Sequence, residues 1–448
     1  MNNLETQRPE SVSLGDAFFY WLKLGFISFG GPAGQISMMH QELVEKRRWI
    51  SEGRFLHALN YTMVLPGPEA QQLATYIGWL MHGVKGGVIA GLLFVLPSFF
   101  ILVGLTWAYL SYGDTPVASG LLYGIKPAVT AIVLFAAYRI GSRALKNGFL
   151  RTIAVTAFGA IYFLNVPFPY IVIVAGCLGF LGAKFAPKKF QLGAHGTQAS
   201  ISYGPAIIDD HTPVPKHAKF NIFRALAIAG IFVLLWLGAI GLVVLWQGND
   251  SVLVQMAIFF TKAAFVTFGG AYAVLPYVHQ GGVETYGWLT TAQMMDGLAL
   301  GETTPGPLIM VVSFVGFVGG WTKAIFGAAL LPLAGIIAAF VATFFTFLPS
   351  FLFVLLGGPA VEATRNDVKF TAPLTGITAA VVGVILNLGV FFAAHVFWPK
   401  GFSGEFDVYA LFITLISIVA LTKFKRSVME VILFSASLGL LISYTALV

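Results

Sequence analysis

The chain has 448 residues, of which 57% are hydrophobic and 10% charged, and its mean hydropathy is +0.83. Soluble globular domains carry about 25% charged residues, so the composition excludes an ordinary soluble protein and indicates an integral membrane protein. The net charge of +7 does not indicate nucleic-acid binding, because Lys and Arg lie in short loops between apolar runs. The one cysteine, Cys177, lies in an apolar run, which excludes a disulfide framework and a Cys-based metal site.

In the first part of the chain, apolar runs follow one another and are long enough to cross a bilayer as helices. Residues 1–15 form a polar lead without the basic start, apolar core and cleavage site of a signal peptide. Residues 16–38 are apolar but contain Gly30-Gly31-Pro32, which does not continue a regular helix. After a basic loop, residues 55–82 form two short apolar arms separated by Pro66-Gly67-Pro68. Further apolar segments are predicted at residues 86–112, 117–140, 152–165 and 167–183.

Residues 184–221 are the one long polar stretch, and so few apolar residues do not bury a core of their own. The sequence therefore predicts an N-terminal membrane unit over residues 1–183, a cytoplasmic linker over 184–221 and a C-terminal membrane unit over 222–448. The spans predicted in the second unit are 222–247, 323–356, 371–397, 408–422 and 428–447, and its breaks are Gly269-Gly270 and Pro305-Gly306-Pro307.

The chain contains an internal duplication. Residues 29–68 recur at residues 268–307 with a constant offset of 239, and twelve of the forty positions are identical. Ordinary residue frequencies give roughly two or three identities in such a window. A second echo, Leu-Pro-Ser-Phe at residues 96–99 and 348–351, follows in the same order. We expect the repeat core of the second unit to begin near residue 254.

The distribution of basic residues orients the two copies. If the loop with Lys46, Arg47, Arg48 and Arg54 lies in the cytoplasm and the broken segments are re-entrant, the other basic loops also fall inside. The two copies then face opposite ways, as in many secondary transporters. A second arrangement, in which the broken segments cross fully, puts some basic loops outside. The predicted fold class is an all-α polytopic membrane protein with two homologous inverted-topology repeats and broken, re-entrant helices.

The breaks are the candidate binding site. Lipid does not satisfy the backbone groups that a broken helix exposes, and each resumed half-helix directs N–H groups and its positive dipole end at the gap. Four such ends meeting near the midplane predict a site for a tetrahedral dianion; the alternative is that the breaks are hinges or tight helix contacts. The predicted substrate-binding residues at the breaks are Gly30, Gly31, Pro32, Gly67, Pro68, Gly269, Gly270, Gly306 and Pro307.

Charged residues inside apolar segments are costly and usually functional. Lys23 and Lys262 occupy matched positions and are predicted to bind substrate, unless their side chains snorkel to the interface. Glu69 and Glu302 flank the Pro-Gly-Pro breaks, so either is a candidate carrier of a coupling proton or a cap on a half-helix. Candidate neutral hydrogen-bond donors to an oxyanion are Thr303, Thr304, Ser28, Thr267, Gln71 and Gln72.

Other matched residues indicate structure rather than chemistry. His40 and His279 have no carboxylate or His cluster at metal-ligand spacing around them, so we expect a structural or gating role and no metal site. Trp49 and Trp288 are expected to anchor at the membrane interface. The chain has no GxSxG, Walker A or HExxH pattern, so it predicts no catalytic residue and no cofactor.

At these residues the chain resembles the chromate ion transporter (CHR) family. The resemblance rests on FGGPAGQI at residues 29–36, LPGPEAQQLATYIGW at 65–79, LPSF at 96–99, TFGGAYAVLPY at 267–277 and TPGPL at 304–308. Two homologous halves in one chain are similar to the long, two-domain members of that family. The resemblance implies a transporter, not an enzyme, that exports chromate across the bacterial inner membrane, driven by the proton-motive force, with sulfate competing or exchanged.

Alternatives to this reading remain open at the level of the sequence. They are a transporter or channel for sulfate or another oxyanion, and a membrane-embedded enzyme acting on an oxyanion. The second copy has Leu308 in place of Glu69 and Ala271 in place of Pro32, so the two half-sites are expected to be unequal. The expected partners are the solute and the lipid bilayer rather than nucleic acid, and the sequence does not decide between a monomer and a homodimer.

Overall fold

The computed structural model describes residues 9–29, 31–185, 203–210, 212–268, 270–363 and 371–445. Within these ranges the chain is helical, and a single isolated β-bridge joins Ile50 and Ile208. Six of the described helices are long and apolar enough to cross a membrane. The predicted class, an all-α polytopic membrane protein, is confirmed.

The first repeat consists of eight helical segments, one of which is a sharply bent hairpin. They are α1 (Leu14–Ile27), α2 (Gly31–His40), the π-helix η1 (Gln41–Lys46), α3 (Glu52–Val64), α4 (Glu69–Tyr112), α5 (Pro116–Ala144), α6 (Gly148–Leu164) and α7 (Phe168–Phe185). The α4 backbone is not helical at His82 and Gly83, where Gly83 has a φ of +64°. A Cβ on Gly78 would lie 2.5 Å from the carbonyl oxygen of Gly86. The two arms of α4 therefore pack closely and antiparallel, and the first arm is a half-helix.

The second repeat has the same order of elements. They are α10 (Val252–Val266), α11 (Ala271–His279), the π-helix η3 (Gln280–Thr285), α12 (Thr291–Thr303), the 3₁₀ turn η4 (Leu308–Met310), α13 (Val311–Thr322), the 3₁₀ turn η5 (Ala328–Leu330), α14 (Leu331–Ala363), α15 (Thr371–Phe397), α16 (Val408–Thr422) and α17 (Val428–Thr445). The pairs η1/η3 and α3/α12 differ by 239 at both ends, so the sequence offset is also a structural offset.

The hairpin of the second repeat lies between α13 and α14. A Cβ on Gly320 would lie 2.4 Å from the carbonyl oxygen of Ala334, so these two helices also pack tightly. The predicted span over residues 323–356 is wrong at its start, because this segment begins with the turn of the hairpin. Gly327 adopts a φ of +81° in that turn, and the long helix begins only at Leu331.

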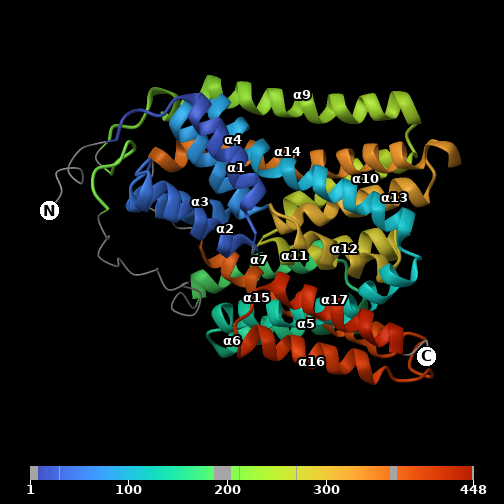
Figure 1. The fold of residues 1–448 in the computed structure, drawn as a ribbon. Helices are drawn as coiled ribbons and strands as arrows, with labels where there is room; N and C mark the ends of the chain where they lie inside the picture. Colours follow the sequence, from blue (N-terminus) through green and yellow to red (C-terminus); the bar gives the residue numbers. More distant parts are fainter. Residues whose placement is uncertain are drawn as a thin grey trace.

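Helix α9 (Ile222–Gln247) joins the two repeats and lies along one edge of the bundle (Figure 1). None of its residues is buried, and the indole of Trp236 donates to the hydroxyl oxygen of Thr261 on α10 at 3.0 Å. Because α9 carries the chain from one end of the bundle to the other, α10 enters from the end opposite to α1 (Figure 1). This arrangement confirms the predicted inverted repeats.

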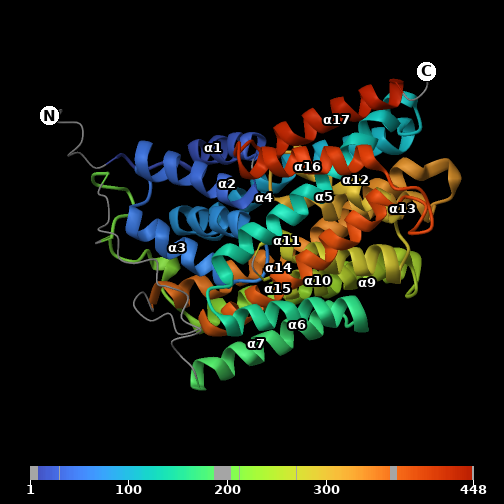
Figure 2. The same cartoon turned by 90° about the horizontal axis from the view of Figure 1, so that it is seen from below.

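The last three helices of each repeat interlock with those of the other. Helix α5 of the first repeat packs against α16 and α17 of the second, and α15 of the second packs against α6 and α7 of the first (Figure 2). Since α5 corresponds to α15 in the repeat, the two sets of contacts are related by the same pseudo-symmetry.

The two ends of the bundle differ in the number of Lys and Arg residues that they carry. We call the end with residues 41–54, the turn at Gly83 and residues 203–210 and 212–218 the basic face. Residues 203–210 of the linker lie against this face, because the Ile208 N–H donates to the Trp49 carbonyl oxygen and the Ser51 N–H donates to the Ile208 carbonyl oxygen, both at 3.0 Å. We call the other end, which carries residues 113–115, 286–290, 323–330 and 398–407, the opposite face. There the rings of Trp246 and Phe326 lie 5.0 Å apart.

The two π-helices explain the matched His and Glu residues. A π-helix bonds each residue to the fifth residue along the chain, so side chains five apart lie over one another. His40 Nδ1 lies 3.1 Å from the Glu45 carboxylate, and His279 Nδ1 lies 3.4 Å from that of Glu284. Each pair gives its histidine a structural contact, and the predicted gating role of these residues stays a prediction.

The matched tryptophans close the same two loops. The Trp49 N–H donates to the carbonyl oxygen of Leu43 at 2.8 Å, and the Trp288 N–H donates to that of Gly282 at 2.7 Å. The predicted interfacial position is wrong for both, since Trp49 is 4% and Trp288 1% exposed. Each indole packs inside the protein because the loop folds back over its own repeat.

Candidate functional site

Two equivalent hydrogen bonds join the breaks of one repeat to those of the other. The Gly306 N–H donates to the Ser28 carbonyl oxygen at 2.9 Å, and the Gly67 N–H donates to the Thr267 carbonyl oxygen at 2.7 Å. Both donors and both acceptors differ by 239 in number, so the bonds are related by the repeat. We call the contact of Ser28 with Gly306 the first joint and that of Gly67 with Thr267 the second joint.

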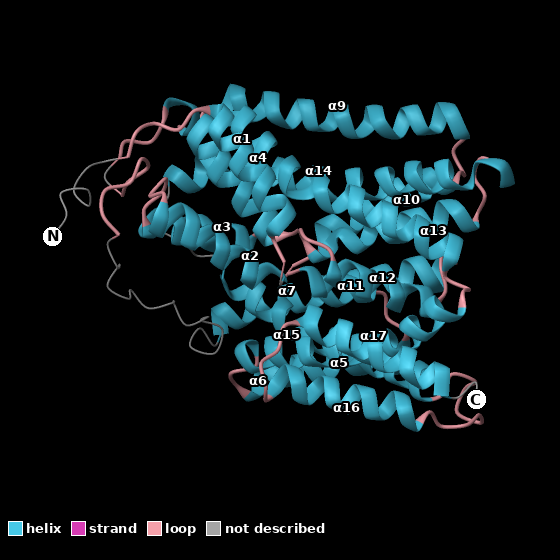
Figure 3. Ribbon diagram, in the orientation of Figure 1, coloured by secondary structure: helices cyan, strands magenta, loops and turns pink. Residues whose placement is uncertain are grey.

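The two joints lie close together in the middle of the bundle. The hydroxyl of Tyr272, just after the second joint, donates to the carboxylate of Glu302, just before the Pro-Gly-Pro break of the first joint. Figure 3 shows loop segments crossing the centre of the molecule, whereas most other loops lie at its two ends. All four predicted breaks are present and are gathered at one place.

The Leu-Pro-Ser-Phe echo supplies the wall of each joint. A Cβ on Gly306 would lie 2.8 Å from the Cβ of Ser98, and a Cβ on Gly67 would lie 2.6 Å from the Oγ of Ser350. Each serine thus packs against the glycine of the other repeat. Gly67 and Gly306 also have φ values of +121° and +93°, a conformation that favours glycine. Their geometry fits the tight-contact alternative, and their N–H groups already have partners.

The glycines that precede the resumed half-helices have different surroundings. Gly31 has a φ of +71° and nothing within 4 Å of its Cβ position, and Gly270 has a φ of +96° and only the Glu69 carboxylate, at 3.8 Å. The first N–H groups of a helix have no acceptor within that helix. The starts of α2 and α11 therefore combine open space with exposed amides, as an anion site requires. Gly30 and Gly269 lie outside the described residues.

A glutamine side chain braces each joint. Gln35 Nε2 donates to the carbonyl oxygens of Ser28 at 3.1 Å and Gly306 at 2.6 Å, and Gln72 Nε2 donates to that of Pro66 at 2.7 Å. Both side chains are fully buried, and their Oε1 atoms have no hydrogen-bond partner among the described residues.

Both bracing glutamines come from the first repeat. The positions that match Gln35 and Gln72 are Val274 and Val311 in the second repeat, and a valine side chain makes no hydrogen bond. The first repeat therefore supplies the bracing side chain of both joints. This asymmetry extends the one that the sequence predicted at Glu69 and Pro32.

The other predicted binding residues are placed as follows. The side chains of Lys23 on α1 and Lys262 on α10 are exposed. The Thr303 and Thr304 hydroxyls donate to the carbonyl oxygens three residues earlier, both at 3.0 Å, so their single hydrogens are already used. Pro32 lies in the first turn of α2, while Pro68 and Pro307 directly precede α4 and η4.

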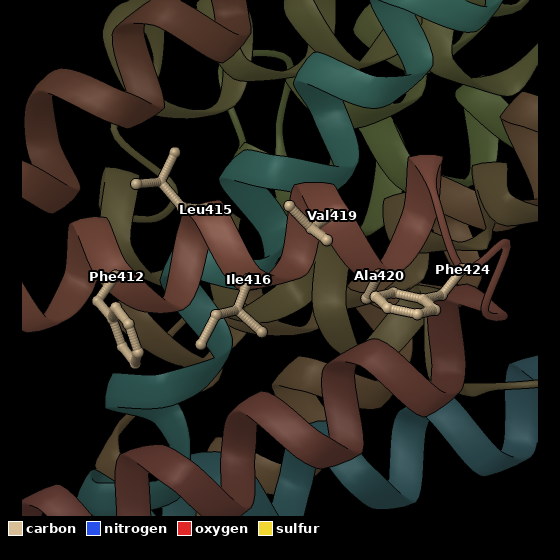
Figure 4. Close-up of a pocket in the computed structure, with 6 residues that line it drawn as sticks. All are labelled: Phe412, Leu415, Ile416, Val419, Ala420 and Phe424. Atoms are coloured by element: carbon tan, nitrogen blue, oxygen red, sulfur yellow. The ribbon is translucent and has the colours of Figure 1, made fainter.

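A surface groove lies away from these breaks. It runs along α16 and is lined only by apolar side chains (Figure 4), which are Phe412, Leu415, Ile416, Val419, Ala420 and Phe424. Such a lining offers no donor to an anion, and it suits a helix face in contact with lipid. Among the described residues, no three His, Cys, Asp or Glu side chains are grouped so as to hold a metal ion.

The sequence did not assign roles to Gln35, Ser98, Ser350 and Tyr272. The signals present were the position of Gln35 within FGGPAGQI and the repeated Leu-Pro-Ser-Phe. The echo marked both serines as matched positions, but it did not show which surface they contact.

Comparison with known proteins gives one family. The sequence profile of the family described as Chromate transporter matches residues 15–180 and 254–440, one segment in each repeat. A probable chromate transport protein of Synechococcus elongatus is 28% identical over 96% of each chain. Chromate transport proteins of Cupriavidus metallidurans and Pseudomonas aeruginosa are 28% and 33% identical, over 98% and 84% of this chain and 95% and 80% of theirs. No solved structure matches the chain.

Proposed function

Because this chain belongs to the chromate transporter family, we propose that it carries chromate out of the bacterial cytoplasm as a secondary transporter of the inner membrane. The observation that carries the proposal is the match of the family profile to both repeats, together with relatives named chromate transport protein that align over most of their length. Sulfate has the same tetrahedral shape and charge, so it competes with chromate or is exchanged for it.

The solute is held at the starts of α2 and α11. The space beside Gly31 and Gly270 admits an oxyanion to the main-chain N–H groups of the two half-helices. The dipoles of these helices stabilise negative charge without buried cations. The first repeat adds Gln35 and Gln72, which hold the breaks in place.

A coupling proton is carried by Glu69 or Glu302. Glu69 is the first residue of α4 and lies beside Gly270, while Glu302 accepts a hydrogen bond from Tyr272 in the first turn of α11. Both carboxylates thus flank one half-helix start. Since a carboxylate repels an oxyanion, protonation at this place changes the affinity for the solute.

The two repeats move against each other about the joints. We assign the basic face to the cytoplasm, because it carries Arg47, Arg48 and Arg54. Inverted repeats give the protein two conformations of similar construction, one open to each side.

Flux in proteoliposomes tests the proposal. Purified protein is reconstituted, and radiolabelled chromate uptake is measured while the pH gradient, the membrane potential and the internal sulfate are varied independently. We expect saturable chromate flux that a pH gradient accelerates and that sulfate reduces. The matched control is Gly31→Leu, which fills the space at α2. Absence of chromate flux above protein-free vesicles refutes the proposal, and sulfate flux without chromate flux supports the sulfate transporter in its place.

A further inference from the structure

A buried polar network ties the two repeats together near the basic face. Arg54 of α3 forms an ion pair with Glu362 of α14, and the hydroxyl of Tyr76 on the first arm of α4 donates to the same carboxylate at 2.5 Å. Arg54 is 3% and Glu362 4% exposed, so the pair is desolvated. Two residues of this network belong to the first repeat and one to the second.

A second network ties the repeats together near the opposite face. The Tyr109 hydroxyl on the second arm of α4 donates to Asp296 of α12 at 2.9 Å, and Lys126 Nζ on α5 lies 3.9 Å from the same oxygen. Asp296 is 2% exposed. Here the buried charge belongs to the second repeat and its two partners to the first.

The networks occupy corresponding places in the two repeats. Helix α3 corresponds to α12, and α14 corresponds to the second arm of α4, since both carry the Leu-Pro-Ser-Phe echo. Asp296 matches position 57, one helical turn after Arg54. Tyr109 lies 26 residues beyond Gly83 on one arm, which corresponds to about 39 Å along that helix. The networks therefore lie on opposite sides of the joints.

Each network holds a helix that leads from one face to a joint. Helix α3 leads from the basic face to the second joint, and α12 leads from the opposite face to the first joint. A solute that reaches a joint from one face has to pass between this helix and the hairpin of the other repeat. A buried ion pair adds little net stability, but a partner left alone in the interior is costly. Such a pair separates only when both groups become hydrated, so it favours a fully closed or fully open state.

We propose that the Arg54–Glu362–Tyr76 and Asp296–Tyr109–Lys126 networks are the two gates of the transporter and open in turn. This inference rests on the proposed transport by alternating access. The gate at the basic face is the stronger one. In the gate at the opposite face, Lys126 is only at ion-pair distance and Asp296 Oδ1 has no hydrogen-bond partner among the described residues. The gate at the opposite face therefore opens first from the conformation described.

The linker positions the gate at the basic face. Arg54 Nε donates to the carbonyl oxygen of Asp209 at 3.3 Å, and Arg54 Nη2 donates to that of Thr212 at 3.0 Å. Ser51 Oγ, at the start of α3, donates to Asp210 at 2.7 Å. These bonds orient the guanidinium toward Glu362. They also keep two of its N–H groups bonded, so fewer N–H groups need water when the ion pair separates.

Accessibility of one engineered thiol tests the gates without any solute. Cys177→Ser removes the native thiol, and Thr303→Cys places a reporter at the end of α12, beside the breaks. Full-length protein is labelled with a membrane-impermeant maleimide from each side, in whole cells and in inside-out vesicles. We expect Arg54→Gln to raise the labelling rate from the cytoplasmic side about tenfold, and Asp296→Asn to raise it from the other side by a similar factor.

Two controls make the result specific. Lys46→Gln removes a positive charge from the basic face, and Lys46 contacts no residue of either network. We expect this variant to have the parental labelling rate from both sides. Arg54→Lys keeps a positive charge and hydrogen-bond donors opposite Glu362, so we expect its labelling rate to lie closer to the parental rate than that of Arg54→Gln.

The labelling pattern decides the inference. Equal increases from both sides, or parental rates in folded Arg54→Gln and Asp296→Asn proteins, overturn it, and so does an Arg54→Lys variant that labels as fast as Arg54→Gln. Because no solute is present, a protein that fails to carry chromate but shows the expected pattern refutes the proposed substrate and supports the gates.

Discussion

Gly306→Ala tests whether the joints are packed as the structure describes. The new Cβ would lie 2.8 Å from Ser98 Cβ, which is closer than real Cβ contacts, and 3.2 Å from Ser98 Oγ, which is tighter than most of them. Overpacking of this kind costs about 1–3 kcal/mol, and a φ of +93° costs alanine about 1–2 kcal/mol more. We therefore expect the free energy of unfolding to fall by about 2–5 kcal/mol.

Adding Ser98→Gly to Gly306→Ala should recover the cost of overpacking but not the cost of the positive φ. It removes both close atoms and leaves the Phe94 carbonyl oxygen, at 3.4 Å, as the nearest neighbour. The double-mutant cycle should give a coupling energy of about 1–3 kcal/mol. Thermal unfolding in detergent and reversible denaturation of all four proteins measure it.

Two comparisons sharpen this test. Gly31 has a similar positive φ but no neighbour within 4 Å of its Cβ position. Gly31→Ala should therefore lower the free energy of unfolding only by the backbone cost, about 1–2 kcal/mol. Ser350→Ala should relieve Gly67→Ala only in part, because it removes Ser350 Oγ at 2.6 Å but leaves Gln72 Nε2 at 2.7 Å. The packing described for the joints would be refuted if Gly306→Ala lowered the free energy of unfolding as much in the Ser98→Gly background as in the parent. Equal decreases for Gly31→Ala and Gly306→Ala would refute it as well.

Three further predictions concern the site and the basic face. Gly31→Leu should abolish chromate flux in proteoliposomes while the protein still inserts; near-normal flux would show that α2 is not part of the site. Gln35→Leu should lower the free energy of unfolding by about 1–3 kcal/mol, because it leaves the Gly306 carbonyl oxygen without its side-chain donor, and an unchanged melting temperature would contradict the bracing role. The hydrogen bond from Arg47 lowers the pKa of Glu42 below its ordinary value of 4.5. The ion pair therefore stabilises the folded protein above pH 4.5, and this stabilisation is lost as the pH falls through the lowered pKa. The melting temperature of Glu42→Gln should therefore lie below that of the parent at neutral pH and meet it in acid; a constant difference would rule out this ion pair as the cause.

The breaks and the inversion could be predicted because each has a local signal. Gly-Gly and Pro-Gly-Pro interrupt a helix wherever they stand, and a constant offset of 239 reports a duplication directly. The span 222–247 was predicted with the bounds of α9 because both of its ends are marked by polar residues. The start of α14 was missed because the turn before it, around Gly327, is almost as apolar as the helices that it joins.

The contacts between the repeats could not be predicted in the same way. Ser98 and Gly306 are 208 residues apart, and their meeting depends on how two copies pack, which no local pattern encodes. For the same reason, Gly67 and Gly306 were grouped with Gly31 and Gly270 as binding residues. Only the structure separates the glycines that pack from those beside open space. The π-helices carry no propensity signal, so the burial of Trp49 and Trp288 was also missed.

Helix α9 contributes almost nothing to the packed interior, yet the order of the whole molecule depends on it. It adds one membrane crossing between the two repeats, so the second repeat begins on the opposite side of the membrane from the first. Without that crossing the second copy would enter the membrane the same way up as the first, and the Ser28–Gly306 and Gly67–Thr267 bonds could no longer be related by a two-fold rotation about an axis in the membrane plane. A change of sequence in α9 is therefore tolerated as long as the segment still spans, whereas a loss of its length abolishes both joints at once.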